Sequence, residues 1–540
     1  MKNAKLIIIF LILFLPPSLL SPSPWEGRGG VVGMGLLAQT QLRKLTMAEM
    51  AINSLYVDSV DEKKLVEDAI RGMLNKLDPH STYSTAKETR SMTESLQGSF
   101  EGIGVQFNMV EDTLLVIQPV VNGPSEKVGI LAGDRIVMVN DTAIAGVKMA
   151  RDDIMRRLRG PKGTKVRLGI VRRGISDLLS FTVKRDKIPV YTLDAYYMIK
   201  PTVGYIRIGS FGATTHEEFL HALDTLKEKS QGKMTDLILD LQDNGGGYMQ
   251  AAVEVANEFL QPGDLIVYTE SRSMPRQEFK ARGHGRLRDG IRVAVLINEY
   301  SASAAEIVTG ALQDQDRATV IGRRSFGKGL VQRPIEFPDG SMIKLTISHY
   351  FTPSGRCIQK PYVKGESKEY SEDIERRFKH GELYSADSIH FADSLKFETL
   401  REHRTVYGGG GIMPDHFVPL DTTQYTLFHR RLAAKSVIIN TNLKYIDGHR
   451  KELKRKYPSF EDFRASFEVP QSLINDLLKE GEKQKVKAVD EVELQRSLPA
   501  IRLQMKALIA RDLWGMNEFY TIINQESHIV QRALEVMGMK

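Results

Sequence analysis

The sequence contains a single cysteine, Cys357, among 540 residues. A disulfide within the chain needs two cysteines, so a scaffold held together by disulfides is excluded. The excess of charge is also small, since 74 basic residues face 67 acidic ones, and a net charge of +7 gives no reason to expect a nucleic-acid partner. Beyond the N-terminal segment, no stretch reaches the roughly 18 consecutive apolar residues that indicate a membrane-spanning helix.

Apolar residues make up 42% of the chain and charged residues 26%. This is the composition of an ordinary soluble protein that can bury large cores, so a chain disordered over most of its length is excluded. A length of 540 residues is too great for one compact domain. We therefore expect about three domains, since domains usually contain roughly 100 to 200 residues.

The N-terminal segment has the pattern of an export signal. Lys2 and Lys5 precede an unbroken apolar run over residues 6–15, and sequence rich in Ser, Pro and Gly follows it. This resembles a secretory signal peptide, because the run is about half of the roughly 20 residues that cross a bilayer. We expect a cleaved signal peptide over residues 1–38 and a periplasmic or otherwise exported protein, with an N-terminal membrane anchor as the less favoured alternative.

Two patterns follow in the next part of the chain. Apolar residues recur at helical spacing over residues 42–77, up to Pro79, which predicts a helical N-terminal segment within residues 39–98. Over residues 99–187 the pattern changes to short strands separated by Gly and Asn turns, which predicts a small, mostly-β domain. Its predicted strands are residues 104–108, 113–118, 135–140 and 165–172, and its predicted helix is 149–158.

Strands and helices alternate in the middle of the chain, which predicts an α/β fold with a βα core and a largely parallel sheet over residues 188–420. Residues 365–405 within it are charged and poorly periodic, which favours an insertion or mobile loop. Residues 421–540 are helical in pattern, with charges of both signs that nearly cancel. The predicted core strands are 203–208, 236–240, 292–297 and 318–321, and the helices include 217–229 and 304–312.

The first candidate for chemistry is a serine at a turn from strand to helix. Ser303 lies in the run YSASAAE, after the apolar strand 293–297 and before a helical stretch. At such a turn the hydroxyl is exposed above the sheet, and the free N–H groups of the first helical turn point at whatever it attacks. The alternative is an ordinary helix cap, since Ser303 and Glu306 also fit the capping-box pattern.

A serine nucleophile needs a base, and the twelve histidines offer no clear partner. His80, in the run LDPHS, favours a structural role in a turn. A lysine can act as base where burial lowers its pKa from about 10.4 toward neutrality. Lys328 lies in SFGKGLVQ between two glycines and beside apolar residues, and Gln332 is placed to accept a hydrogen bond from it. A Gly-Lys-Gly run by itself also fits a surface turn.

Three glycines, Gly245, Gly246 and Gly247, end the run DLQDNGGG directly after the apolar strand 237–239. Glycines at a strand end let backbone N–H groups face a ligand, as an oxyanion hole demands. An ordinary loop uses the same residues, so this run alone leaves both interpretations open.

The combination of these motifs is more specific than any one of them. The elements DLxxNxGG, SASAxE and FGKGxVQ, with Lys328 placed 25 residues after Ser303, resemble the C-terminal processing (tail-specific) peptidase family. The resemblance extends to LDPHS upstream and to FPDGS, YFTPSGR and GIMPD downstream, so it covers about residues 45–420. It implies a serine peptidase whose core, residues 188–420, is of the ClpP/crotonase-like type.

Carried over residue by residue, the resemblance implies that Ser303 is the nucleophile, Lys328 the general base and Gln332 the residue that orients this lysine. The N–H groups of Ala304 and of one glycine of the run, Gly246, would form the oxyanion hole.

Three further positions bear on the site. Asp314 falls where some members of the family carry a supporting acidic residue. Gln242 and Gly245 depart from the common pattern, which has Arg and Pro at these positions, and the departure puts the stiffness of the glycine loop in doubt.

The mostly-β domain, residues 99–187, resembles a PDZ domain inserted before the core. The run FEGIGV corresponds to the glycine loop of that domain, which implies that Gly102, Ile103, Gly104 and Val105 bind a terminal carboxylate while the peptide adds as an extra strand. The implied partners are C-terminal tails of protein substrates. Arg156, Arg157 and Arg159 could help to sense the carboxylate, although a solvated charged face is favoured. The helical ends leave open an adaptor protein or a homo-oligomer.

The resemblance implies cleavage of proteins near their C-termini, after small or apolar residues, through an acyl-enzyme on Ser303, with no metal or cofactor required. Two alternatives remain. A catalytically silent tail-binding or scaffold protein predicts a lost nucleophile or base, whereas Ser303, Lys328 and Gln332 are all present. A crotonase-type acyl enzyme acts on thioesters without a Ser/Lys pair, and the PDZ domain and the export signal also argue against it.

Overall fold

The structure is a computed structural model that describes residues 31–110, 112–423 and 425–539, with side chains from residue 40 onward. The chain divides into two compact units, Met1–Met73 and Leu74–Lys540. Most of the predicted signal peptide, residues 1–30, lies outside the described residues, and residues 31–38 belong to the first helix. Over the described ranges, no helix is both long enough and apolar enough to cross a membrane.

The first unit contains helix α1 (Val31–Leu55) and nearly all of helix α2 (Glu62–Leu74). The predicted helical segment is therefore interrupted over residues 56–61, where Val, Ser and Asp disfavour helical backbone. The interruption ends at Asp61, whose carboxylate accepts a hydrogen bond from the backbone N–H of Lys64 at 3.1 Å and so caps the start of α2.

The mostly-β domain of the second unit has an antiparallel sheet around an apolar interior that includes Leu114, Ile136 and Ile154. The predicted strands and helix are confirmed within two residues, and strands at both ends of the domain add to them. The elements are β2 (Ser99–Gly102), β3 (Val105–Val110), β4 (Thr113–Pro119), α4 (Pro124–Lys127), β5 (Arg135–Val139), β6 (Thr142–Ala143), α5 (Arg151–Leu158), β7 (Lys165–Val171), β8 (Leu179–Lys184) and β9 (Asp186–Pro189). The sheet order is β3-β4-β5-β7-β8, and β2 pairs with β9.

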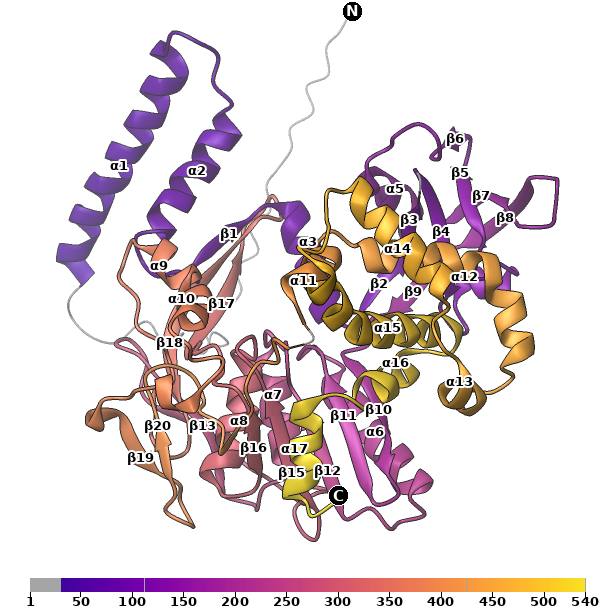
Figure 1. The fold of residues 1–540 in the computed structure, drawn as a ribbon. Helices are drawn as coiled ribbons and strands as arrows, with labels where there is room; N and C mark the ends of the chain where they lie inside the picture. Colours follow the sequence, from indigo (N-terminus) through magenta and orange to yellow (C-terminus); the bar gives the residue numbers. More distant parts are fainter. Residues whose placement is uncertain (1–30, 111, 424, 540) are drawn as a thin grey trace, which may run out of the picture. The chain divides into compact units, whose positions relative to one another are not determined.

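The core confirms the predicted alternation of strands and helices (Figure 1). Its elements are β10 (Leu193–Lys200), β11 (Val203–Ile208), α6 (Thr215–Lys229), β12 (Asp236–Asp240), α7 (Met249–Asn257), β15 (Arg292–Ile297), α8 (Ala304–Asp314), β16 (Thr319–Gly322) and β21 (His416–Phe417). The sheet order is β10-β11-β12-β15-β16-β21, with β10 antiparallel and the others parallel. The strands are buried on both faces, which explains their continuous apolar runs.

A second, antiparallel sheet contains β1 (Thr82–Ser84), β13 (Leu265–Glu270), β14 (Gln277–Lys280), β17 (Leu330–Glu336) and β18 (Met342–Phe351). In the β17–β18 hairpin, Gln332 lies opposite Thr346 and Pro334 opposite Lys344. Strand β1 pairs with the other edge of β18 and is followed by helix α3 (Ala86–Leu96). The helical prediction for residues 39–98 is therefore wrong at β1, because three residues are too few to show a strand period.

Of the two alternatives for residues 365–405, an insertion or a mobile loop, the loop is wrong, and the insertion stays a prediction. The segment contains α9 (Ser367–Ser371), α10 (Asp373–Lys379), two short 3₁₀ turns and β19 (Lys396–Glu398), which pairs with β20 (Thr405–Tyr407). Arg377 is only 2% exposed and donates to the carbonyl oxygens of Ser325 and Arg324 at 3.0 and 2.6 Å. The segment packs through polar side chains with backbone partners, and such packing leaves no apolar period in the sequence.

The C-terminal region is helical, as predicted, and most of it surrounds its own apolar core, with Phe463, Ile474 and Met505 among the buried side chains. Its helices are α11 (Leu427–Ala434), α12 (Val437–Lys456), α13 (Phe460–Ser466), α14 (Gln471–Lys483), α15 (Glu491–Leu513), α16 (Met516–Ile523) and α17 (His528–Val536).

The last helix, α17, is part of the core rather than of a separate arm. Ile529, Val530 and Ala533 pack in one apolar cluster with Tyr205 and Leu296 of the parallel sheet. Figure 1 shows α17, in yellow, against the strands of this sheet. Sequence periodicity predicts the helix but carries no information about the surface that it covers.

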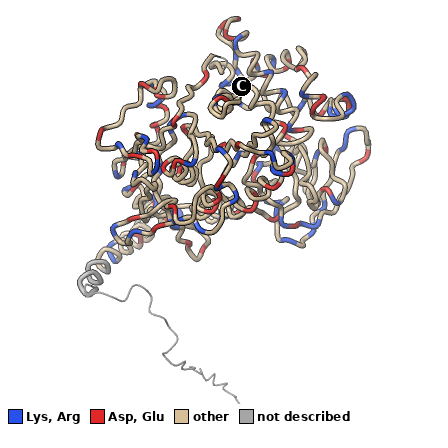
Figure 2. Tube along the Cα trace, turned by 90° about the horizontal axis from the view of Figure 1, so that it is seen from below, with Lys and Arg blue, Asp and Glu red and all other residues tan. Residues whose placement is uncertain are grey.

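Basic and acidic residues are interspersed along the described chain, as Figure 2 shows. Many of them form close pairs, such as Arg172 with Asp134 and Arg292 with Asp236. The distribution agrees with the nearly balanced composition.

Candidate active site

Ser303 lies at the turn between β15 and α8, as the sequence predicts. Its backbone has φ 56° and ψ −113°, a conformation that residues with a side chain rarely adopt. The capping residues Thr85 before α3 and Ser459 before α13 are instead extended. A strained turn from strand to helix presents a serine hydroxyl above the sheet. The conformation of Ser303 therefore favours the nucleophile over the ordinary helix cap.

The buried carboxylate of Glu306 links the backbone of Ser303 to the loop that carries Lys328. Its Oε2 accepts hydrogen bonds from the backbone N–H groups of Ser303 and Lys328 at 2.8 and 2.9 Å. Its Oε1 accepts from the Gly327 N–H at 2.7 Å and from the Ser325 hydroxyl at 2.5 Å. Burial raises the pKa of Glu306, whereas these four donors favour its charged form. One carboxylate thus sets the spacing of the two candidate catalytic residues.

The amine of Lys328 is part-buried and donates a hydrogen bond to Gln332 Oε1 at 2.9 Å. Burial is the main cause that lowers the pKa of Lys328 to about 8, and the positive charge of Lys344 is the next. Glu306 and Asp78 act in the opposite direction. A lysine with this pKa is neutral in about a tenth of the molecules at pH 7 and in half of them at pH 8, and the neutral form can act as a general base.

A hydrogen bond from the side-chain nitrogen of Gln332 fixes the orientation of its amide. Its Nε2 donates to the backbone carbonyl of His80 at 2.5 Å, so its Oε1 is the atom that faces Lys328. The His80 ring lies 2.7 Å from the Tyr370 hydroxyl, and burial, followed by the charge of Lys328, lowers the pKa of His80 to about 4. His80 is therefore neutral near pH 7 and contributes its carbonyl, which agrees with the predicted structural role.

The turn that presents this carbonyl is fixed to β18. Asp78 accepts hydrogen bonds from the backbone N–H groups of His80 and Ser81, both at 2.9 Å, and from the Thr346 hydroxyl at 3.0 Å. The LDPHS motif thus positions Gln332, and through it Lys328, without contributing a side chain to the reaction.

Gly246 lies against Ser303, where the sequence places the oxyanion hole. A Cβ at Gly246 would lie 2.7 Å from Ser303 Cβ and 2.9 Å from the backbone N of Ala304, and φ at Gly246 is +98°. The Gly246 N–H is engaged, however, because it donates to Asn244 Oδ1 at 2.8 Å. Asn244 is fully buried, and its amide donates to the Ile208 carbonyl at 2.8 Å. The glycine loop therefore lies beside Ser303, and the Gly246 N–H is hydrogen-bonded to the Asn244 side chain.

Ser303, Ala304, Lys328, Gln332 and Gly246 all line one cleft of about 900 Å³. Side chains of helix α3 line one part of this cleft, and side chains of the β17–β18 hairpin line another part. The apolar side chains in the lining, which include Met92, Leu96, Met249, Leu330 and Met342, suit a substrate with small or apolar side chains.

The predicted carboxylate loop lines a second, small hollow of about 50 Å³. Gly102, Ile103, Gly104 and Val105 form one side of it, and Met155, Leu158 and Arg159 the other. The Arg159 guanidinium lies over the Phe100 ring at 4.8 Å and pairs with Glu94 of α3. The expectation that these arginines form a solvated charged face is therefore wrong for Arg159. Arg156, by contrast, is exposed and pairs with Asp153 of its own helix.

Two features of the site are not visible in the sequence. Glu306 is predicted only as a capping residue, because its bonds to Ser325 and Lys328 join positions 19 and 22 residues apart. The second feature is that side chains of helix α3 line the cleft, which depends on how this helix packs and not on a local sequence pattern.

Asp314 accepts hydrogen bonds from Arg356 and Ser354, so its role is to hold the loop after β18 rather than to support Lys328.

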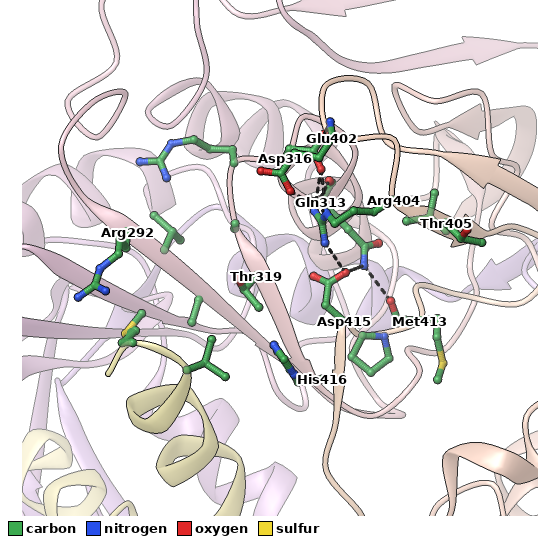
Figure 3. A pocket seen from close by; sticks show the side chains of 18 of the residues that line it. Arg292, Gln313, Asp316, Thr319, Glu402, Arg404, Thr405, Met413, Asp415 and His416 are labelled. Atoms are coloured by element: carbon green, nitrogen blue, oxygen red, sulfur yellow. Dashed lines mark hydrogen bonds and ion pairs between the residues drawn. The ribbon is translucent and has the colours of Figure 1, made fainter. Parts of the chain in front are cut away.

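A further cavity of about 680 Å³ lies away from Ser303, beside β15, β16 and residues 402–416 (Figure 3). Its charged side chains pair with one another, since Arg404 bonds to Asp316 at 2.9 Å and to Asp415 at 2.8 Å. Across the residues whose side chains are described, no group of three or more His, Cys, Asp or Glu is arranged to hold a metal ion.

Comparison with known proteins reveals clear relatives. The chain is 34% identical to the carboxy-terminal processing protease CtpA of Bacillus subtilis (strain 168) over 393 residues, which are 71% of this chain and 82% of that protein. The chain belongs to the carboxy-terminal processing proteases. The profile of Peptidase family S41 matches residues 202–368 of the protease, and that of the PDZ domain matches residues 102–187. The protein is thus a C-terminal processing serine protease with a PDZ domain, rather than a crotonase-type enzyme or a silent scaffold.

The comparisons also found a second relative, two further family profiles and a solved structure. The protease is 37% identical over 309 residues to the carboxy-terminal-processing protease of Bartonella bacilliformis, which is 57% of this chain and 70% of that one. The profile of the CtpB N-terminal domain matches residues 33–89, and that of a family of unknown function, DUF8443, matches residues 428–515. The solved photosystem II D1 C-terminal processing protease is 24% identical, covers 72% of this chain and 95% of its own, and has a TM-score of 0.35.

Replacing Gly246 by Ala should abolish proteolysis. The added methyl group would overlap Ser303 Cβ and the Ala304 N, and alanine disfavours a φ of +98°. Gly245→Ala is the matched control, since no atom lies within 4 Å of a Cβ at Gly245 and its φ is not left-handed. We expect it to retain most of the wild-type kcat/KM. Equal activities of the two variants in a peptide-cleavage assay would contradict the close approach of Gly246 to Ser303.

Proposed function

We propose that Ser303 and Lys328 are the catalytic dyad of this protease. The observation that carries the proposal is that Glu306 holds the backbones of both residues while the Lys328 amine, desolvated and bonded to Gln332, faces the same cleft as Ser303. A desolvated lysine with a fixed direction can accept the proton of a serine hydroxyl.

The chemistry then follows in two steps. Neutral Lys328 accepts the Ser303 proton as Oγ attacks the scissile carbonyl, and the resulting ammonium donates that proton to the leaving amine. The acyl group remains on Ser303 until a water molecule, deprotonated by Lys328, attacks it and releases the new C-terminus. Gln332 keeps the lysine directed at the serine throughout, because its amide is held by the His80 carbonyl.

The Ala304 N–H and a glycine N–H stabilise the oxyanion in this proposal. If Gly246 supplies the second donor, its bond to Asn244 must be exchanged for one to the substrate. We further propose that the core is of the ClpP/crotonase-like type, for which the βα order and the glycine loop at the carboxyl end of β12 are the support.

We also propose that the PDZ domain captures the free C-terminus of a protein substrate. The glycine loop Gly102–Val105 precedes and enters β3, and helix α5 lies across the hollow, which is the arrangement that takes a peptide as an added strand. Arg159 at the end of α5 lies beside this loop, and we propose that its guanidinium, which pairs with Glu94 in this structure, contacts the carboxylate of the bound tail. Cleavage near C-termini would then follow from delivery of the tail to the Ser303 cleft.

The dyad predicts the pH dependence of kcat/KM. Because Lys328 must be neutral and its pKa is about 8, kcat/KM should rise about tenfold per pH unit below pH 8 and level off above it. Ser303→Ala and Lys328→Met should lower kcat by at least about a thousandfold at every pH while they still bind substrate. The measurement is cleavage of a quenched peptide without ionisable side chains. Activity of Lys328→Met, or a flat profile, would contradict the dyad.

The tail proposal predicts that a free carboxylate matters. An unfolded substrate with an apolar C-terminal tail should be cleaved with a lower KM than the same substrate with an amidated C-terminus. Arg159→Gln should narrow this difference, because it removes the charge beside the loop. Arg156→Gln removes an equal charge from the exposed side of α5 and should preserve the difference. If amidation has no effect on wild-type KM, the PDZ domain does not select the carboxylate.

A further inference from the structure

A second lysine lies in the catalytic cleft. Lys344 is the third residue of β18, and its Cα partners are Pro334 of β17 and Thr82 of β1. Side chains alternate along a strand, so Lys344 is on the same face of the hairpin as Gln332, which lies opposite Thr346. Gln332 and Lys344 are thus diagonal neighbours, within reach of each other's long side chains. Both line the cleft together with Lys328.

The ammonium group of Lys344 has no close counter-ion. Among the residues whose side chains are described, no carboxylate oxygen lies within 4 Å of it. Of the two carboxylates in the cleft lining, Glu88 caps α3 through Thr85, and Glu336, opposite Met342, is an exposed diagonal neighbour of Lys344 that forms no ion pair with it. The ammonium group of Lys344, which lines the cleft, is therefore not held in an ion pair by either of them.

The charged and titratable groups that face Lys328 come from every element around it. Glu306 of α8 bonds to its backbone, and Asp78 and His80 lie in the turn before β1. Tyr350 of β18 lines the cleft and donates its hydroxyl to the Ser303 carbonyl at 3.1 Å. The remaining two are the carboxylates of Glu88 and Glu336. A further cation, Lys360, acts on His80 and pairs with Asp373. Among the described residues that line the cleft, Lys344 is the one cation besides Lys328.

We propose that Lys344 is a positioning residue of the catalytic centre, whose ammonium group repels a proton from the Lys328 amine and so keeps that amine ready to receive the proton of Ser303. The proposal rests on the proposed role of Lys328 as the base. Two ammonium groups that line one cleft repel each other, and burial already disfavours the charged form of Lys328.

Lys344 is also suited to this role by its exposure. Its side chain is only partly buried, whereas burial of the Lys328 amine is the main cause that lowers the pKa of Lys328. The charge acts through the cleft on the protonated form of Lys328 alone. Substrate that fills the cleft expels water and strengthens this repulsion.

The test is the pH profile of kcat/KM for the full chain, measured with a quenched peptide that carries no ionisable side chain. Lys344→Met should move the rising limb of the profile to higher pH by about half to one unit. At pH 7 this lowers kcat/KM by about three- to tenfold, and above pH 9.5 the variant should match the wild type within about twofold. Lys344→Arg keeps the charge and should keep the wild-type midpoint.

Arg333→Met is the matched control, because Arg333 is exposed on the opposite face of the same hairpin and its loss removes an equal charge. Its midpoint should equal that of the wild type. The proposal is overturned if Lys344→Met loses the same factor at every pH, or if its effect is confined to the KM of substrates with acidic side chains. Failure of the dyad itself is a separate result, since then Lys328→Met remains active or the wild-type profile has no rising limb near pH 8.

Discussion

The catalytic centre depends on one buried carboxylate. Glu306 is fully enclosed and accepts four hydrogen bonds, two from the segments that carry Ser303 and Lys328 and two from the loop between them. A carboxylate at this depth is costly to desolvate unless all its lone pairs are used. Each donor is therefore held where the carboxylate needs it. This accounts for a left-handed φ at Ser303, which an isolated turn would not maintain.

Around this carboxylate, each residue that we propose as catalytic is positioned by a group for which the proposal has no chemical role. The Asp78 turn holds the His80 carbonyl, the carbonyl holds Gln332, and Gln332 directs the Lys328 amine. Residues far apart in sequence thus converge on one cleft. Helix α3 connects the two sites, since it lines this cleft and also supplies Glu94 to Arg159 beside the PDZ loop.

Local patterns in the sequence predict much of this and packing decides the rest. The parallel strands and the Ser303 turn are visible because buried strands are continuously apolar and capped helices start with recognisable residues. The order of residues 365–405 is not visible, because Arg377 is buried by hydrogen bonds to carbonyls rather than by apolar contacts. The engagement of the Gly246 N–H by Asn244 depends on a side-chain rotation that no spacing encodes.

The most direct test of this account is the kcat of Glu306→Gln, measured beside its melting temperature. The amide keeps the volume of the side chain but offers one acceptor oxygen, and in either orientation its NH₂ group lies against at least one backbone N–H donor. We expect kcat to fall by at least about a hundredfold in a folded protein, since hydrogen bonds to a charge contribute about 1.5–3 kcal/mol each. Glu258→Gln, at a buried carboxylate paired with His216, should leave kcat unchanged. Wild-type kcat in Glu306→Gln would contradict the central role of this carboxylate.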